Sequence, residues 1–188
     1  GDLSNDELVR IVRDVCATEV EPDAMRYDAE SLRLESIRPE DDYGGRRVTL
    51  NGELGAARLR VQIDIGIGDV VTPAPVWIDY PGLLDLPQPR LRAYTPESVM
   101  AEKVHAMVVL GSRNSRMRDF FDVDALAQQT AFERTTLASA MRATFERRRT
   151  KLPTATPLAL TRAFYESADK QIQWRAFRAK INSNVAPE

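Results

Sequence analysis

Lys103 is the residue of this sequence that most needs a chemical explanation. On an α-helix, positions 99, 103, 106 and 110 share one face, and the other three residues are Val99, Ala106 and Leu110. A lysine in such an apolar row must extend to solvent, pair with a carboxylate or lie beside an anionic ligand, because unpaired burial would lower its pKa or cost several kcal/mol. The position therefore allows either a structural ion pair or an anion-binding role.

Two carboxylates follow Lys103 on the next expected helix. Asp119 and Asp122 are three residues apart and share a face with Leu126, while Arg118 is placed to form a surface ion pair with Asp122. Both acids fall in the first turns of that helix, where the helix dipole favours negative charge. Helix-start electrostatics alone could explain them, so this helix taken singly is weak evidence for a site.

Asp64 is a third candidate, on the polar face of the most regular strand pattern in the chain. Gly66 and Gly68 follow it on the same face. Small residues there would let a ligand or metal approach the sheet, and a strand carboxylate can serve as a metal ligand. The alternative is an ordinary solvent-facing aspartate near the end of a strand.

Several other kinds of site are excluded by composition. His105 is the only histidine and Cys16 the only cysteine, so the chain has no His-based metal cluster, no Ser-His-Asp triad and no disulfide framework. Neither a G-x-x-x-x-G-K-[ST] loop nor a G-x-G-x-x-G turn occurs. The chain also lacks a run of about 18 apolar residues, so we expect no membrane span. We expect both His105 and Cys16 to be core residues.

The first half of the chain is rich in strand patterns. A capping box at Ser4–Glu7 predicts the start of a helix that extends to about Cys16. Alternating patterns predict strands at 32–38, 58–68 and 75–80, and Asn51-Gly52 predicts the turn of a hairpin.

The second half is helical. Thr95 and Pro96 suit the start of a helix that runs to about Leu110, where Gly111 can close it. Further helices are predicted at about 115–129 and 134–148, followed by two shorter helical runs. This order indicates an α+β arrangement, with one region at 1–92 and a helical region at 93–188.

Charge is distributed unevenly along the chain. The segment 133–182, which we call the basic segment, contains eleven Lys and Arg residues but four Asp and Glu residues, a net charge of +7. Since the whole chain carries −2, the remainder carries −9. Such asymmetry suggests contact with phosphate, and the alternative is a solvated helical surface.

Three stretches carry a resemblance to a known family. In this order, VQIDIGIGDVV, YTPESVMAEKVHAM and NSRMRDFFDVDAL resemble the AbiEii/AbiGii-type nucleotidyltransferases, which are toxins of bacterial abortive-infection and toxin–antitoxin systems. The similarity covers roughly residues 3–165, and its most specific part is the AEK helix followed by the (K/R)D-x-x-D helix. It implies a cytoplasmic protein with a nucleotidyltransferase-like α+β fold, in which a mixed sheet with flanking helices precedes a helical C-terminal region.

The resemblance also implies roles for individual residues. Asp64 matches a sheet acid expected to bind metal, Lys103 matches a helix lysine near the nucleotide phosphates, and Asp119 matches the acid of the (K/R)D motif. These three are the expected catalytic residues, while Lys103, Arg118 and Asp122 are expected to bind the nucleotide. Such enzymes use Mg²⁺ and an NTP, and a hydroxyl of tRNA, another RNA, a protein or a small molecule attacks the α-phosphorus.

The sequence departs from the family at its opening motif. No Gly-Gly/Ser turn followed by an Asp-x-Asp pair precedes Asp64, and Asp41 and Asp42 are adjacent rather than alternating. The opening GDLSNDEL resembles the segment that follows the Asp-x-Asp strand. We therefore expect that the chain begins downstream of the main metal-binding carboxylates and that, alone, it is inactive and binds Mg²⁺ and nucleotide weakly.

Two function hypotheses follow, in different classes. The first is a nucleotidyltransferase toxin, which predicts that Asp64, Lys103 and Asp119 face one cleft. The second is a non-catalytic module of the same fold that binds RNA or an antitoxin protein through the basic segment. A structural helical adaptor is a third reading, supported only by the structural alternatives given above.

Overall fold

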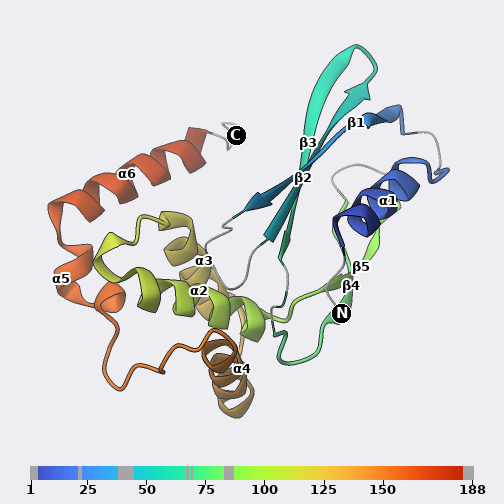
Figure 1. Ribbon diagram of the computed structural model, residues 1–188. Helices are drawn as coiled ribbons and strands as arrows, with labels where there is room; N and C mark the ends of the chain where they lie inside the picture. The colour runs from blue at the N-terminus through green and yellow to red at the C-terminus, as the bar shows by residue number, and fades with distance from the viewer. Residues whose placement is uncertain are drawn as a thin grey trace. The chain divides into compact units, whose positions relative to one another are not determined.

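The chain forms two compact units, residues 1–69 (unit 1) and 70–188 (unit 2). The structure, a computed structural model, describes residues 4–20, 23–37, 45–66, 68, 70–82 and 87–183. Unit 1 contains a sheet of three strands, and most of the helices belong to unit 2 (Figure 1). The α+β class is therefore confirmed. The predicted division of the chain into regions 1–92 and 93–188 stays a prediction.

Unit 1 opens with helix α1 (Asn5–Cys16), whose start is the predicted capping box. The backbone N–H of Glu7 donates to the Ser4 hydroxyl at 3.2 Å, and the Glu7 carboxylate accepts from the Ser4 backbone N–H at 2.8 Å. Two donors that the helix cannot satisfy internally are thereby paired.

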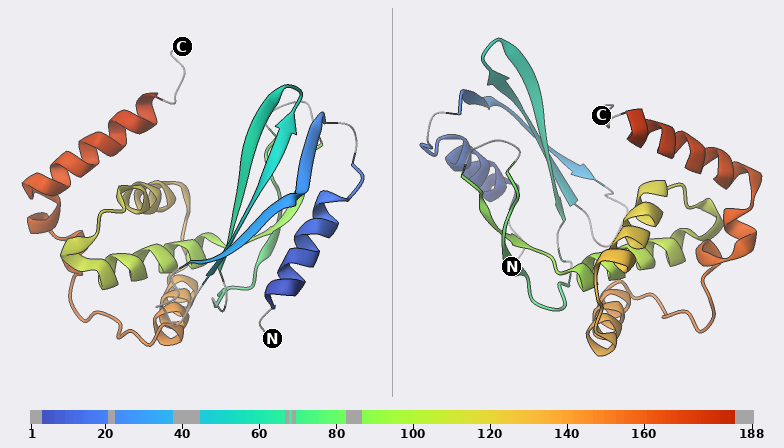
Figure 2. Two further views of the ribbon diagram at one scale, coloured as in Figure 1. Left: turned by 45° about the horizontal axis from the view of Figure 1, so that its top comes forward. Right: turned by 180° about the vertical axis from the view of Figure 1, so that it is seen from behind.

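The sheet of unit 1 is an antiparallel meander of β1 (Met25–Ile37), β2 (Gly45–Leu54) and β3 (Ala57–Gly66), with β2 in the centre. Helix α1 lies against this sheet (Figure 2). Val12 of α1 packs on Val48 and Leu50 of β2, and these three buried residues form the core of the unit.

The prediction of a hairpin turn at Asn51-Gly52 is wrong, because β2 continues through both residues to Leu54. Leu54 pairs with Ala57, so the turn residues are Gly55 and Ala56. Gly55 has a φ of 57°, the left-handed conformation that a two-residue hairpin turn with glycine at its first central position requires.

The burial of the sheet explains why the turn lies further along the chain. With the turn at residues 55 and 56, Val48 pairs with Ile63 and Leu50 pairs with Val61, which gives both core residues apolar partners. A turn at residues 51 and 52 would place Glu53 opposite Leu50. The register is thus set by the buried face rather than by the strongest local turn sequence.

Unit 2 begins with an antiparallel strand pair, β4 (Val76–Asp79) and β5 (Arg90–Ala93), and continues with helices. The predicted strand near residues 75–80 and the three predicted helices are confirmed, whereas β5 was not predicted. The remaining elements, in chain order, are α2 (Pro96–Leu110), η1 (Gly111–Arg113), α3 (Met117–Gln129), α4 (Arg134–Arg147), η2 (Leu158–Leu160), α5 (Arg162–Tyr165) and α6 (Ala168–Ser183). Within the described residues, no helix is long and apolar enough to span a bilayer.

Helix α2 is the central helix of unit 2, with α3 and α4 on different sides of it (Figure 1). The Thr95 hydroxyl caps its first turn, and Gly111, with a φ of 49°, ends it. His105 is buried against Phe145 of α4, while Met107 is buried against Phe164 of α5. Because α2 is covered on more than one side, it is apolar around most of its circumference.

Two glycine substitutions test the position of the hairpin turn. We expect Gly55→Ala to lower the free energy of unfolding by about 1 kcal/mol, because alanine is strained at positive φ. We expect Gly52→Ala to be neutral or slightly stabilising, since an added Cβ would meet its nearest neighbours at 3.5 Å and strand glycines are entropically unfavourable. Urea denaturation of both variants measures this, and a reversed order would place the turn at Asn51-Gly52.

Candidate functional site

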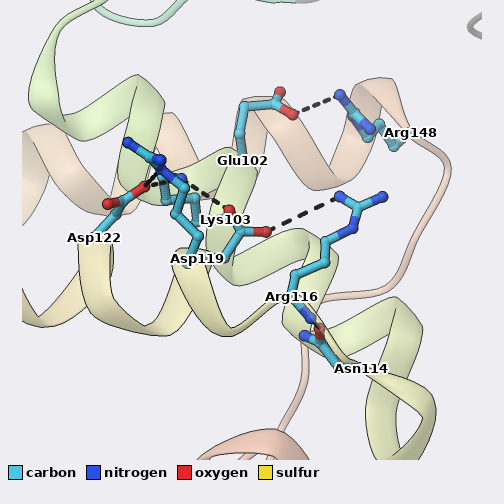
Figure 3. Close-up of polar contacts among 8 residues, drawn as sticks. Glu102, Lys103, Asn114, Arg116, Asp119, Asp122 and Arg148 are labelled. Carbon is cyan, nitrogen blue, oxygen red and sulfur yellow. Dashed lines mark hydrogen bonds and ion pairs between the residues drawn. The ribbon is translucent and has the colours of Figure 1, made fainter. Parts of the chain in front are cut away.

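Lys103 forms one cluster with the two carboxylates of the following helix (Figure 3). Its ammonium Nζ lies 2.9 Å from Asp119 Oδ1 and 2.8 Å from Asp122 Oδ2. The side chains of Lys103, Asp119 and Asp122 are 19%, 18% and 30% exposed, so the cluster is mostly shielded from solvent. We call these three residues the Lys103 cluster.

Helix geometry brings these residues together across two elements. Asp119 and Asp122 lie one turn apart on the same face of α3, so both carboxylates can point toward α2. Lys103 is in the middle of α2, and its long side chain reaches out of a half-buried row toward them. Two of the three predicted catalytic residues are therefore in contact, and Asp122 joins them.

The ammonium of Lys103 remains charged in this environment. Burial alone would lower its pKa, but the hydrogen bonds to Asp119 and Asp122 outweigh that effect and raise the pKa above its ordinary value. A lysine that is protonated at neutral pH cannot serve there as a nucleophile or a general base. Its chemistry is therefore electrostatic, as a point charge that holds an anionic group.

Two arginines flank the cluster at the start of α3. Arg116 Nη1 is 4.0 Å from Asp119 Oδ2, and Arg118 Nε is 3.9 Å from Asp122 Oδ2. Both separations are at the outer limit of an ion pair, and the Arg118 side chain is 82% exposed. Arg118, predicted to bind nucleotide, is thus close to the cluster, and its weak ion pair holds it loosely.

A surface pocket of about 570 Å³ opens next to Asp119, between the start of α3 and α6. Its α3 wall carries both arginines, and its α6 wall carries an amide and apolar groups. The lining residues are Ser115, Arg116, Met117, Arg118, Asp119, Gln173, Ala176 and Phe177. Its volume suits a small organic ligand, and the arginines favour an anionic one.

The sequence did not point to Arg116 or to the residues of α6 as parts of this site. Arg116 was detectable in principle, because it precedes Asp119 by three residues and so lies one helical turn away. Gln173 and Phe177 are more than fifty residues further along the chain. Only the packing of α6 on α3, where Phe177 meets Phe121 with ring centroids 6.0 Å apart, brings them to the pocket.

Asp64 has a different environment, in the sheet of unit 1. It is the cross-strand partner of Arg47, whose Nε and Nη2 donate to the two carboxylate oxygens at 2.7 and 2.8 Å. The hydrogen bond from Arg47 lowers the pKa of Asp64, which is therefore ionised at neutral pH. Gln62 adds longer contacts of 3.4 and 3.5 Å.

The described residues do not fit a Mg²⁺ site. Both oxygens of Asp64 already accept from Arg47, and no group of three or more His, Cys, Asp or Glu side chains in the described part of the chain could hold a metal ion. Asp41 and Asp42 lie outside the described residues. Metal binding by Asp64, and a cleft that it shares with Lys103 and Asp119, stay predictions.

Comparison with protein families gives one match over nearly the whole chain. The family model described as "Nucleotidyl transferase AbiEii toxin, Type IV TA system" matches residues 1–187. The matched range includes the Lys103 cluster, the α3–α6 pocket and Asp64. No curated protein matches the chain.

Replacing Lys103 tests how much its ammonium contributes to the stability of the protein. We expect Lys103→Met to lower the free energy of unfolding at pH 7 by about 2 kcal/mol, because two partly buried carboxylates would be left facing each other. The deficit should shrink at alkaline pH, because the stabilisation from an ammonium whose pKa is raised on folding is lost as the pH rises through that pKa. Thermal denaturation between pH 7 and 11 measures both effects.

The matched control is Lys151→Met, at an exposed lysine of unit 2. We expect it to change the free energy of unfolding by less than about 0.5 kcal/mol at every pH. If Lys103→Met and the wild-type chain had the same free energy of unfolding at pH 7, the proposed stabilisation by the Lys103 ammonium would be contradicted.

Proposed function

Because the chain belongs to the AbiEii nucleotidyltransferase toxin family, we propose that it serves the transfer of a nucleoside monophosphate from an NTP to an RNA or other acceptor. It would do so in the bacterial cytoplasm, as the toxin of a type IV toxin–antitoxin system, and an antitoxin protein is its proposed partner. The observation that carries this proposal is the Lys103 cluster, in which the lysine of the AEK helix meets both acids of the following helix.

Each residue of the cluster has a proposed role in this reaction. The acceptor hydroxyl would release its proton to water as its oxygen forms a bond to the α-phosphorus, while the bond from that phosphorus to the α–β bridging oxygen breaks and pyrophosphate leaves. Lys103 would bind a triphosphate oxygen and compensate the charge that develops on pyrophosphate. Asp119 and Asp122 would hold the ammonium in place until the phosphate arrives.

The arginines of the pocket extend this proposal to the rest of the anionic substrate. Arg116 and Arg118 lie at the rim of a pocket that includes Asp119, so a phosphate close to Lys103 would also be within the field of two guanidinium groups. Mg²⁺ remains an expectation from the resemblance, and the proposed steps use only the side chains of the protein.

A second candidate function is a non-catalytic module that binds RNA or an antitoxin. The exposed side chains of Arg175, Arg178 and Lys180 support it, since they give positive charge to α6, the helix that also forms one wall of the pocket. Positive grooves with aromatic side chains are typical of surfaces that bind single-stranded nucleic acid.

Transfer of a labelled nucleotide tests the first candidate. The protein in the full length that its gene encodes is incubated with each of the four α-³²P-labelled NTPs, Mg²⁺ and tRNA, and the label on RNA is measured. We expect Lys103→Ala to reduce the transfer rate by about a hundredfold, because it removes charge stabilisation from the transition state. Lys151→Ala should retain the wild-type rate. Transfer that is unchanged in Lys103→Ala would contradict the proposed role of Lys103.

Salt dependence of RNA binding tests the second candidate. Replacing Arg175 and Arg178 by glutamine should weaken binding and reduce the slope of log K against log salt concentration by about 1.4 for single strands, because two phosphate contacts would be lost. Fluorescence anisotropy with a labelled oligonucleotide measures this. The control replaces Arg58 and Arg60, which are exposed in unit 1, and should leave the slope unchanged. No RNA binding at low salt would exclude this candidate for nucleic acids.

A further inference from the structure

Helix α2 presents its charged residues on two different sides. Successive residues of an α-helix are rotated by about 100°, so Glu102 and His105 lie about 60° apart, whereas Lys103 lies about 160° from His105. Lys103 meets α3, and both Glu102 and His105 meet the C-terminal end of α4. The adjacent residues Glu102 and Lys103 therefore connect α2 to two separate helices.

An ion pair and a buried histidine form the contact with α4. The Arg148 guanidinium donates to a carboxylate oxygen of Glu102, and each of these side chains is 24% exposed (Figure 3). One turn further along α2, His105 Nε2 lies 3.0 Å from the Thr150 hydroxyl. The imidazole also packs edge-on against Phe145, with ring centroids 5.0 Å apart.

Helix α4 ends in a left-handed capping turn beside these contacts. Arg149, directly after the last helical turn, has a φ of 48°, a conformation that commonly ends a helix. The Thr150 N–H donates to the Phe145 carbonyl at 2.9 Å, and the Thr150 hydroxyl donates to the Arg148 carbonyl at 3.0 Å. This turn places Arg148 and Thr150 on the same side of α4, facing α2.

His105 is neutral, so the arginine beside it is not repelled by a second cation. Burial, with a smaller contribution from the charge of Arg148, lowers the pKa of His105 to about 4. At neutral pH the histidine therefore contributes packing and a hydrogen bond, and the Glu102–Arg148 pair supplies a charge interaction between α2 and α4.

We propose that Glu102 and Arg148 are positioning residues, which fix the rotation of α2 and thereby hold the Lys103 ammonium between Asp119 and Asp122. The reason for this positioning rests on the proposed function, in which Lys103 binds the triphosphate. The positioning itself depends only on the contacts of α2 with α3 and α4 and can be measured without any substrate.

The reach of Lys103 makes the site sensitive to small rotations of α2. A rotation of about 15° would move a group about 8 Å from the helix axis by about 2 Å. The two hydrogen bonds of Lys103 measure 2.9 and 2.8 Å, and a displacement of this size would break at least one of them.

The experiment compares Glu102→Gln, Arg148→Gln and the charge-swapped double variant Glu102→Arg/Arg148→Glu with the wild-type chain. NMR of isotopically labelled lysine side chains measures the pKa of Lys103, one of four lysines in the chain. We expect both single variants to lower this pKa by about half a unit, which triples the neutral fraction at a given pH. The swapped pair should restore at least half of the change.

The control removes an ion pair of the same chemistry that does not touch α2. Arg162 Nε lies 2.7 Å from Glu166 Oε1 at the surface of α5. We expect Arg162→Gln to leave the pKa of Lys103 unchanged. Thermal denaturation of every variant is measured in parallel, so that a change in the pKa of Lys103 is compared with the loss of overall stability.

If the Glu102–Arg148 pair only stabilised the fold, this experiment would give a different result. Single variants that are less stable but retain the wild-type pKa of Lys103 would overturn the positioning role, as would a swapped pair that restores stability without restoring the pKa. Failure of the proposed nucleotide transfer would leave the pKa change of Lys103 intact, so the two proposals fail separately.

Discussion

The structure of unit 2 depends on one constraint, a lysine ammonium that is removed from most of its solvent and must be matched by carboxylates. Lys103 meets this constraint through two acids on the facing side of α3. The charge of Lys103 constrains two whole helices as well as one contact. Hydrogen bonds to an ammonium are directional at short range, so they require α2 and α3 to keep one relative position. Apolar contacts in unit 2, such as Met107 against Phe164, supply the non-directional part of the packing.

Local sequence signals determined the helix ends. Ser4 and Thr95 accept hydrogen bonds from the first turns of their helices, and Gly111 takes a positive φ at the end of α2. Each of these features involves a few consecutive residues, so the sequence alone is sufficient. The oddity of Lys103 was also visible, because it depends only on helical periodicity.

Features that depend on distant residues were not predictable in the same way. The turn at Gly55 follows from the burial of Val48 and Leu50 under α1, which outweighed the strong local preference of Asn51-Gly52. Strand β5 consists of RLRA, whose alternation is too short to stand out. Helix α6 was expected as a shorter run, and its contribution of Phe177 to the pocket depends on a tertiary contact with Phe121.

The balance of charge in the Lys103 cluster has a kinetic consequence. One ammonium between two carboxylates carries a net charge of −1, so the cluster itself does not attract a polyanion from a distance. Long-range attraction must come from the exposed Arg118 and its neighbours, whose field extends about 10 Å at moderate salt. The exposed arginines would therefore attract the polyanion, and Lys103 would bind it. Added salt would slow the attraction of the polyanion but would affect the shielded lysine much less.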